Sequence, residues 1–182
     1  MKTFLALIVA VCAAPAFAHG NWQSSSRASA KIAPDPQAVK DAVIQAYAAP
    51  VWGWRGMFAD HTWVAVKPEN APAYTVYEVV GWRLRRGLPA LRIARDIPDR
   101  RWFGSEPRLL LDLRGEQART LADDVAAAAE SYPFAEEYRA FPGPNSNTFT
   151  AWIAKKVPQL GLKLPLRAVG KSYFRVFSAA HE

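Results

Sequence analysis

The spacing of apolar residues changes along the chain between two periods, and the change predicts both strands and helices. Aromatic and β-branched residues fill His61–Val66 and Tyr74–Trp82, as is typical of strands. The prolines and asparagine between them, in residues 67–73, predict the loop of an antiparallel hairpin. Ala90–Arg95 predicts a third strand, and residues 51–58 predict a bulged aromatic strand that leads into the hairpin.

Three- and four-residue spacing predicts three helices elsewhere in the chain. The first begins at Asp35, with a proline at its first helical position, and its apolar stripe reaches Tyr47. The second spans Gly115–Tyr132, and the third follows Asn145. Helices packed against a small antiparallel sheet make a single domain of the α+β class.

The first residues have the pattern of a secretory signal peptide. Lys2 precedes an apolar run that ends in Ala16-Phe17-Ala18, the small-x-small pattern of a cleavage site. We expect residues 1–18 to be removed and the protein to reach the periplasm, with an uncleaved signal anchor as the alternative. Residues 19–34 are polar and predict a flexible lead-in, so residues 35–182 form the single domain.

Few side chains in this sequence could hold a metal ion. Cys12 is the only cysteine and lies within the predicted signal peptide, so the mature protein has no thiol. His61 is the only histidine away from the ends of the mature chain, and no acidic cluster has the spacing of a calcium loop. We therefore expect neither a metal site nor another cofactor.

The chain is basic, with a formal net charge of +7, and its arginines gather between Arg83 and Arg101. A basic face there suits the anionic lipids and acidic polymers of a cell envelope. The expected partners are therefore envelope peptides, glycans or lipids, with peripheral membrane contact through this arginine-rich segment, and not nucleic acid. The plainer interpretation of the same residues is a solvated hairpin.

The stretch Pro142–Phe149 brings a hydroxyl group to the start of a helix. Its prolines and glycine predict a tight turn, and Asn145 or Ser146 then acts as the N-cap. Backbone N–H groups at a helix start favour negative charge, which would suit a nucleophile and its oxyanion. The commoner meaning of these residues is an ordinary helix cap, so the catalytic interpretation needs a partner base.

His61 is the candidate base, because a predicted strand would fix the direction of its imidazole. Glu78 shares a strand face with the apolar Val76 and Val80, so its carboxylate needs either an exposed strand edge or a cationic partner. The predicted hairpin brings Glu78 towards His61, where it would orient the imidazole. The alternatives are a surface glutamate and one paired with arginine.

A resemblance to known families rests on the motifs His61-Thr62-Trp63, Tyr77–Trp82, Arg101–Gly104 and Pro142–Phe149. With them, residues 48–173 resemble an uncharacterised bacterial envelope family catalogued as a domain of unknown function. The order of histidine strand, second strand and Asn-Ser-Asn helix start is also similar to the circularly permuted NlpC-type branch of the papain-like fold. That branch includes lecithin:retinol acyltransferase-like proteins. It implies a permuted papain-like α+β fold with Ser146 in place of the nucleophilic cysteine.

Two functions follow from these resemblances. In the first, the protein is an amide or ester hydrolase or an acyltransferase, in which His61 deprotonates Ser146 and Glu78 orients His61. Asn145 or Asn147 would help the helix start to stabilise the oxyanion. In the second, the protein is a catalytically inactive envelope binding module of the same fold, and an aromatic groove holds a glycan, peptide or lipid. The groove would be lined by Trp52, Trp54, Trp63 and Trp82.

Overall fold

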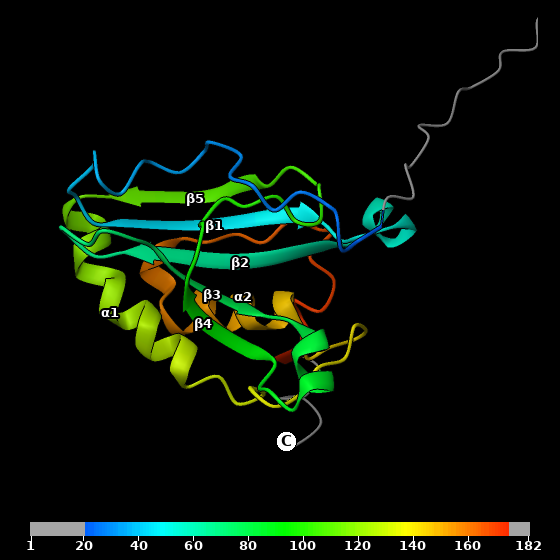
Figure 1. Cartoon of the computed structure of the whole chain (residues 1–182). Coiled ribbons are helices and arrows are strands. Elements are labelled where there is room, and N and C mark those ends of the chain that lie inside the picture. The colour runs from blue at the N-terminus through cyan, green and yellow to red at the C-terminus, as the bar shows by residue number, and fades with distance from the viewer. Residues whose placement is uncertain (1–20, 175–182) are drawn as a thin grey trace, which may run out of the picture.

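The computed structural model describes residues 21–174, so the predicted signal peptide lies outside the described part of the chain. The described residues form one five-stranded antiparallel sheet and two α-helices (Figure 1). The strands are β1 (Val43–Pro50), β2 (Asp60–Lys67), β3 (Thr75–Val79), β4 (Leu91–Arg95) and β5 (Arg108–Arg114), in the order β4-β3-β2-β1-β5. The helices are α1 (Glu116–Glu130) and α2 (Ser146–Lys156), with short 3-10 helices η1 (Trp54–Met57), η2 (Gly81–Arg86) and η3 (Pro158–Leu160).

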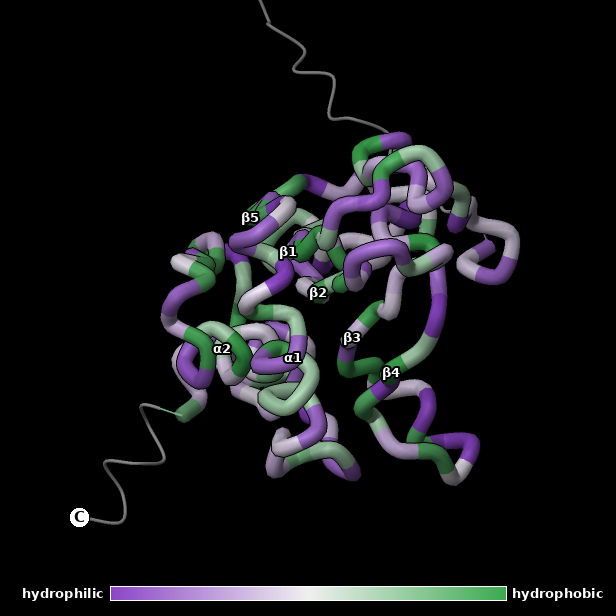
Figure 2. Tube along the Cα trace, turned by 90° about the vertical axis from the view of Figure 1, so that its left-hand side faces the viewer, coloured by the Kyte–Doolittle hydropathy of each residue, from purple (hydrophilic) through white to green (hydrophobic). Residues whose placement is uncertain are grey.

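Both faces of the sheet are covered. The two α-helices lie on one side, and loop segments lie on the other (Figure 2). On the helix side, Val64 of β2 belongs to the same buried cluster as Phe149 and Ile153 of α2. On the loop side, Trp63 of β2 belongs to a second cluster with Trp102. Neighbouring residues of β2 therefore belong to different cores, as the alternation of side chains along a strand requires.

Several predicted elements are confirmed. The hairpin consists of β2 and β3, and β4 adds the third strand with Val79 opposite Leu91. The predicted helix over Gly115–Tyr132 is α1, and the helix expected after Asn145 is α2. A single small α+β domain with an antiparallel sheet is therefore the observed architecture.

The helix predicted from Asp35 to Tyr47 is wrong. Residues Val43–Pro50 form β1, which lies between β2 and β5 in the interior of the sheet. Every residue from Val43 to Ala49 is buried, because both faces of this strand are covered. A strand buried on both faces is apolar throughout, so its sequence lacks the two-residue alternation that identifies a half-exposed strand.

The predicted bulged strand at residues 51–58 is also wrong. This stretch is the connection between β1 and β2, and it contains η1. The second strand of the hairpin is shorter than expected, because β3 ends at Val79 and the chain turns into η2.

Residues 21–34, expected to be a flexible lead-in, are fixed to the sheet's loop-covered face. The buried carboxylate of Asp99 accepts hydrogen bonds from the backbone N–H groups of Ile32, at 2.6 Å, and Ala33, at 3.0 Å. Its Oδ2 also accepts from the Ser29 hydroxyl at 3.0 Å. The segment thereby covers the second core and holds its own side chains in defined positions.

Candidate functional site

The start of α2 is a closed cap. The Asn145 side chain accepts hydrogen bonds from the backbone N–H groups of Asn147, at 2.9 Å, and Thr148, at 3.1 Å. The Thr148 hydroxyl in turn accepts from the N–H of Asn145 at 3.1 Å, which completes a capping box. Asn145 is therefore the N-cap. Two of the N–H groups that could have stabilised an oxyanion are already bonded to it.

The two asparagines that flank Ser146 tie α2 to neighbouring segments. The Asn147 amide donates to the carbonyls of Asp60, at 2.9 Å, and Val169, at 2.8 Å. The Asn145 amide donates to the carbonyls of Ala140, at 3.0 Å, and Val169, at 3.1 Å. Both side chains are buried and their donors are used, so they connect parts of the fold and do not point towards an external ligand.

Ser146 is 4 % exposed, and its hydroxyl makes no hydrogen bond within residues 21–174. Its carbonyl accepts from Thr150 at 3.1 Å and lies 3.5 Å from the Thr62 hydroxyl. Thr62 also donates to the Asn147 side chain at 2.9 Å. The residue of β2 that faces the start of α2 is therefore Thr62.

His61 points to the other face of the sheet. Its imidazole stacks on Trp102 with ring centroids 3.6 Å apart and an interplanar angle of 13°, and it also stacks on Trp63 at 5.5 Å. Because successive side chains of a strand alternate, Thr62 and His61 cannot face the same layer. The structure thus separates Ser146 from His61 by the sheet, and the predicted nucleophile–base pair is not formed.

The expected contact between His61 and Glu78 is present. The imidazole Nε2 lies 3.5 Å from the Glu78 carboxylate, which is long for a hydrogen bond. The carboxylate is also paired with arginine: Arg100 donates to both of its oxygens at 2.6 Å, and Arg92 donates to Oε1 at 2.9 Å. Asp96 completes the network, at 2.8 Å from Arg92 and 3.2 Å from Arg100.

Burial and neighbouring charges shift the pKa of Glu78 in opposite directions. Burial alone would raise its pKa, but contact with His61 and the charges of Arg100 and Arg92 outweigh it and hold the pKa at about 2. Burial lowers the pKa of His61, and the neighbouring Glu78 only partly offsets this. At neutral pH the pair is a neutral imidazole beside an ionised carboxylate.

An aromatic surface lies outside the histidine. The ring centroid of Trp102 lies 5.5 Å from that of Trp82 and 5.1 Å from that of Phe103. The ring centroids of Phe103 and Trp22 are 6.2 Å apart. Trp22 and Trp82 are exposed. Trp63, predicted as a groove residue, is fully buried and donates its indole N–H to the Pro98 carbonyl at 2.7 Å, so it is a core residue.

Arg27 completes this surface. Its guanidinium lies 4.3 Å from the centroid of Phe103 and 6.0 Å from that of Trp82. The backbone beside it is fixed, because the Gly104 N–H donates to the Ser26 carbonyl at 2.9 Å. Arg27 makes no ion pair within residues 21–174, although its side chain is exposed. We call Trp22, Arg27, Trp82 and Phe103 the Arg27 surface.

Phe103 occupies a strained backbone position. Its φ of 50° lies in the left-handed region, which bulky side chains rarely adopt. The turn around it is closed by two hydrogen bonds between Trp102 and Ser105, at 2.9 and 3.0 Å. Strain of this kind is retained where the surrounding structure compensates for it, and it is concentrated at functional sites. Here it directs the Phe103 ring towards Arg27 and Trp82.

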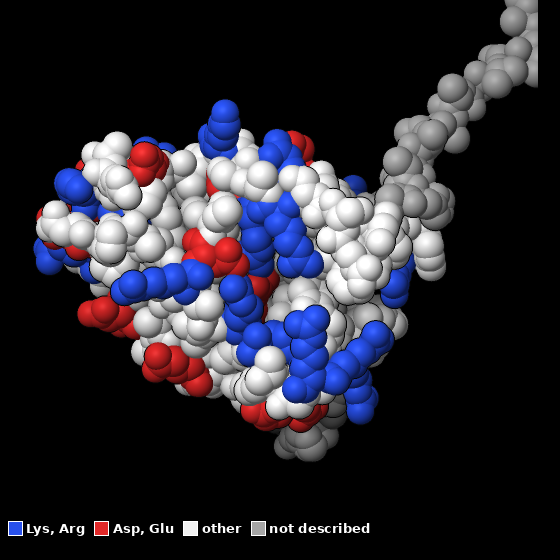
Figure 3. Space-filling model, viewed as in Figure 1, with Lys and Arg blue, Asp and Glu red and all other residues white. Residues whose placement is uncertain are grey.

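Basic side chains surround this part of the molecule. Viewed from the side of the sheet away from α2, Lys and Arg form a band across the face, with a smaller acidic group beside it (Figure 3). The 3-10 helix η2, which carries Trp82, also carries Arg83, Arg85 and Arg86. The predicted basic segment thus lies next to Trp82.

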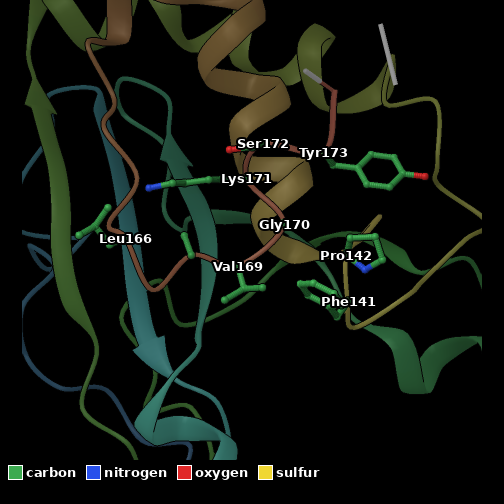
Figure 4. A pocket seen from close by; sticks show the side chains of 9 residues that line it. Phe141, Pro142, Leu166, Val169, Gly170, Lys171, Ser172 and Tyr173 are labelled. Atoms are coloured by element: carbon green, nitrogen blue, oxygen red, sulfur yellow. The ribbon is translucent and has the colours of Figure 1, made fainter. Parts of the chain in front are cut away.

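A separate cavity of about 270 Å³ lies between the Pro142 turn and the segment that follows η3 (Figure 4). Phe141 and Pro142 line one side, and Leu166 lies across from them. The ammonium group of Lys171 on its wall donates to the carbonyls of Leu164 and Pro165, at 3.2 and 2.8 Å. The lining is mostly apolar, and this cation is already used inside the protein.

Within residues 21–174, no group of three His, Cys, Asp or Glu side chains is arranged to hold a metal ion. In the same part of the chain, no helix combines the length and the apolar character needed to cross a membrane.

Residues 41–173 match the model of a protein family described as "Protein of unknown function (DUF3750)". The chain belongs to this family. The match includes His61, Glu78 and α2, together with Trp82 and Phe103 of the Arg27 surface; Trp22 and Arg27 precede it. No significant match was found among curated proteins or among solved structures.

Proposed function

We propose that the protein is exported to the periplasm and acts there as a binding module for an acidic envelope glycan, held at the Arg27 surface. The observation that carries the proposal is an exposed guanidinium between aromatic rings that has no acidic partner within residues 21–174. Export rests on the signal-peptide pattern at residues 1–18.

The chemistry of the Arg27 surface favours an anion. Partial burial and the nearby charge of Arg100 lower the pKa of Arg27, although Glu78 and Asp96 act in the opposite direction. An arriving carboxylate would relieve this unfavourable environment, and arginine binds carboxylates through paired, charge-assisted hydrogen bonds.

The exposed aromatic rings suit a ligand with an apolar ring face beside its anionic group. Trp82 and Trp22 present exposed indole rings, whose large apolar area can pack against the C–H faces of a sugar. A uronic or other acidic sugar supplies both groups at once, with a carboxylate for Arg27 and a ring face for Trp82.

The papain-like relationship is also part of the proposal, as a statement about ancestry. It is supported by the order of elements, in which His61 opens a strand and Asn145-Ser146-Asn147 opens a later helix. With His61 on one face of the sheet and Ser146 on the other, the binding module agrees better with the geometry than the hydrolase or acyltransferase does.

We expect Ser146 to be unreactive. In the Ser146→Cys variant, iodoacetamide should label the new thiol no faster than an exposed reference thiol made by Ser131→Cys. The reason is that no base within residues 21–174 is hydrogen-bonded to the Ser146 side chain, and the N–H groups of Asn147 and Thr148 are bonded to Asn145. Peptide mass spectrometry would assign the label. Labelling faster than the reference, and slowed by His61→Ala, would restore the hydrolase hypothesis.

Calorimetric titration with oligogalacturonate, an acidic oligosaccharide, tests the binding module. We expect Arg27→Gln and Trp82→Ala each to weaken binding about tenfold or more. Arg27→Gln removes the cation that binds the carboxylate, and Trp82→Ala removes the ring that packs against the sugar. Arg119→Gln and Trp54→Ala are matched controls, since these exposed side chains lie elsewhere and should leave binding unchanged. Equal binding of a neutral oligosaccharide, or no effect of Arg27→Gln, would contradict the proposal.

A further inference from the structure

The connection between β1 and β2 exposes apolar side chains at the end of the sheet. Trp52, Trp54, Met57 and Phe58 are 40, 68, 46 and 64 % exposed. None of the three aromatic rings stacks on another ring within residues 21–174. We call residues 51–59 the aromatic tip; it appears in Figure 1 as the teal turn beyond the ends of β1 and β2.

The aromatic tip is a rigid structure. The Ala59 carbonyl accepts from the Val51 N–H at 3.1 Å and closes the loop, and two further N–H groups donate to the Arg55 carbonyl, at 2.9 and 3.0 Å. Gly56 has no space for a side chain, because a Cβ would lie 2.3 Å from the Val51 carbonyl oxygen. Arg167 donates to the Gly56 carbonyl. The apolar side chains are therefore held outward by a folded turn.

These internal hydrogen bonds lower the cost of moving the tip out of water. A backbone whose polar groups are bonded within the protein can enter a poorly hydrated region at little cost, whereas free N–H and C=O groups cannot. Trp is enriched at the boundary between lipid headgroups and acyl chains, and Phe is among the apolar side chains that interfacial helices bury there.

The charge around the tip is mainly positive. Arg55 lies within it, is exposed and makes no ion pair in the described part of the chain. Arg108 and Arg167 lie at its base, both partly exposed, and both contact the buried Asp60, at 2.8 and 3.2 Å. Residues 51–59 contain no acidic residue. Three guanidinium groups against one buried carboxylate leave a local excess of positive charge, which attracts anionic lipid headgroups.

We propose that the aromatic tip inserts into the surface of an anionic lipid bilayer. Trp54 and Phe58 enter the headgroup region, and Arg55, Arg108 and Arg167 contact lipid phosphates. The Arg27 surface does not take part, so membrane contact and glycan binding are separable properties.

Vesicle co-sedimentation of the protein expressed as the full chain tests this proposal. With vesicles of phosphatidylethanolamine and phosphatidylglycerol, the Trp54→Ala/Phe58→Ala variant should bind about tenfold or more weakly than the unmodified protein. The Ile93→Ala/Ile97→Ala variant is the matched control, because it also removes two large exposed apolar side chains, and β4, which carries Ile93, is separated from β2 by β3. It should bind normally. Phosphatidylcholine vesicles should bind the unmodified protein much less.

Lipids brominated in their acyl chains provide a second readout. They should quench tryptophan fluorescence in the unmodified protein, and Trp54→Ala should remove much of that quenching. Equal vesicle binding by the tip variant and the control would overturn the proposal. So would a change in oligomeric state, without vesicle binding, when the tip is altered, because the apolar side chains would then meet a second copy of the chain.

Discussion

Replacing Glu78 by glutamine is expected to lower the free energy of unfolding by about 3 kcal/mol or more. The substitution keeps the shape of the side chain but leaves the buried guanidinium of Arg100 facing a neutral amide, and it removes the charge that faces Arg92. Losing one member of a buried ion pair is costly because the other charge stays in a poorly hydrated site. Urea denaturation followed by circular dichroism would measure the change.

Glu106→Gln is the matched control for Glu78→Gln. Glu106 also pairs with an arginine, Arg101, at 2.6 Å, but its side chain is 63 % exposed. A surface ion pair contributes less than about 1 kcal/mol, so this variant should be almost as stable as the unmodified protein. Similar losses in both variants would show that Glu78 is not in the buried network described above.

The same network should make the protein sensitive to acid. The folded-state pKa of Glu78 is about 2, below its ordinary value of 4.5. Its stabilisation is therefore complete above pH 4.5 and is lost as the pH falls towards 2; it amounts to about 3 kcal/mol. The lowered pKa of His61 acts in the same direction, starting below its ordinary value of 6.5. In Glu78→Gln, stability should vary less with pH between 4.5 and 2.

Asn147→Ala should lower the free energy of unfolding by about 2–3 kcal/mol. The substitution removes three hydrogen bonds of 2.8–2.9 Å and takes this donor away from the buried carbonyl of Asp60 and the partly buried carbonyl of Val169. These bonds connect α2 with β2 and with the segment after η3, so their loss affects how three parts of the fold pack together.

Ser146→Ala is the matched control for Asn147→Ala, because both residues lie in the first turn of α2. The Ser146 hydroxyl makes no hydrogen bond within residues 21–174, so its removal should change stability by less than about 1 kcal/mol. Thermal and urea unfolding of the two variants side by side would measure both effects. A loss for Ser146→Ala as large as that for Asn147→Ala would contradict the assignment of the asparagines as the connecting residues.

The sequence contains enough information to predict the hairpin, β4 and α1, because their patterns are regular and their ends are marked by proline, glycine or asparagine. It also predicts the contact of His61 with Glu78, which follows from the hairpin alone. In contrast, the pattern of β1 is ambiguous. A strand buried on both faces lacks the polar positions that separate a strand from a buried helix.

The pairing of His61 with Ser146 failed for a related reason. On β2, Trp63 and Ala65 lie on the same face as His61, and Val64 and Val66 lie on the same face as Thr62. Both faces are therefore apolar. A strand with one polar face indicates which side chains point towards the core, but a strand with two apolar faces does not. Sequence order could therefore bring the histidine strand and the α2 start together without determining which residue of the strand faces the helix.

Arg27 could not be predicted as a site residue. It lies in a polar stretch without periodicity, and its position depends on long-range contacts such as those of Asp99 with Ile32 and Ala33. The arginine-rich segment between Arg83 and Arg101 indicated part of this region. It begins directly after Trp82, and it contains Arg92 and Arg100, which are bonded to Glu78.

The most direct test of the central claim is a titration of ¹⁵N-labelled protein with oligogalacturonate, followed through the tryptophan indole N–H signals. The Arg27 surface predicts that the signals of Trp22 and Trp82 shift together and saturate, while that of Trp152, whose indole is bonded to the Ala128 carbonyl on the helix side, stays unchanged. In Arg27→Gln, the same shifts should need about tenfold more oligosaccharide or more to saturate. Shifts at Trp152 without shifts at Trp22 and Trp82, or no shift in any signal at saturating oligosaccharide, would contradict the account.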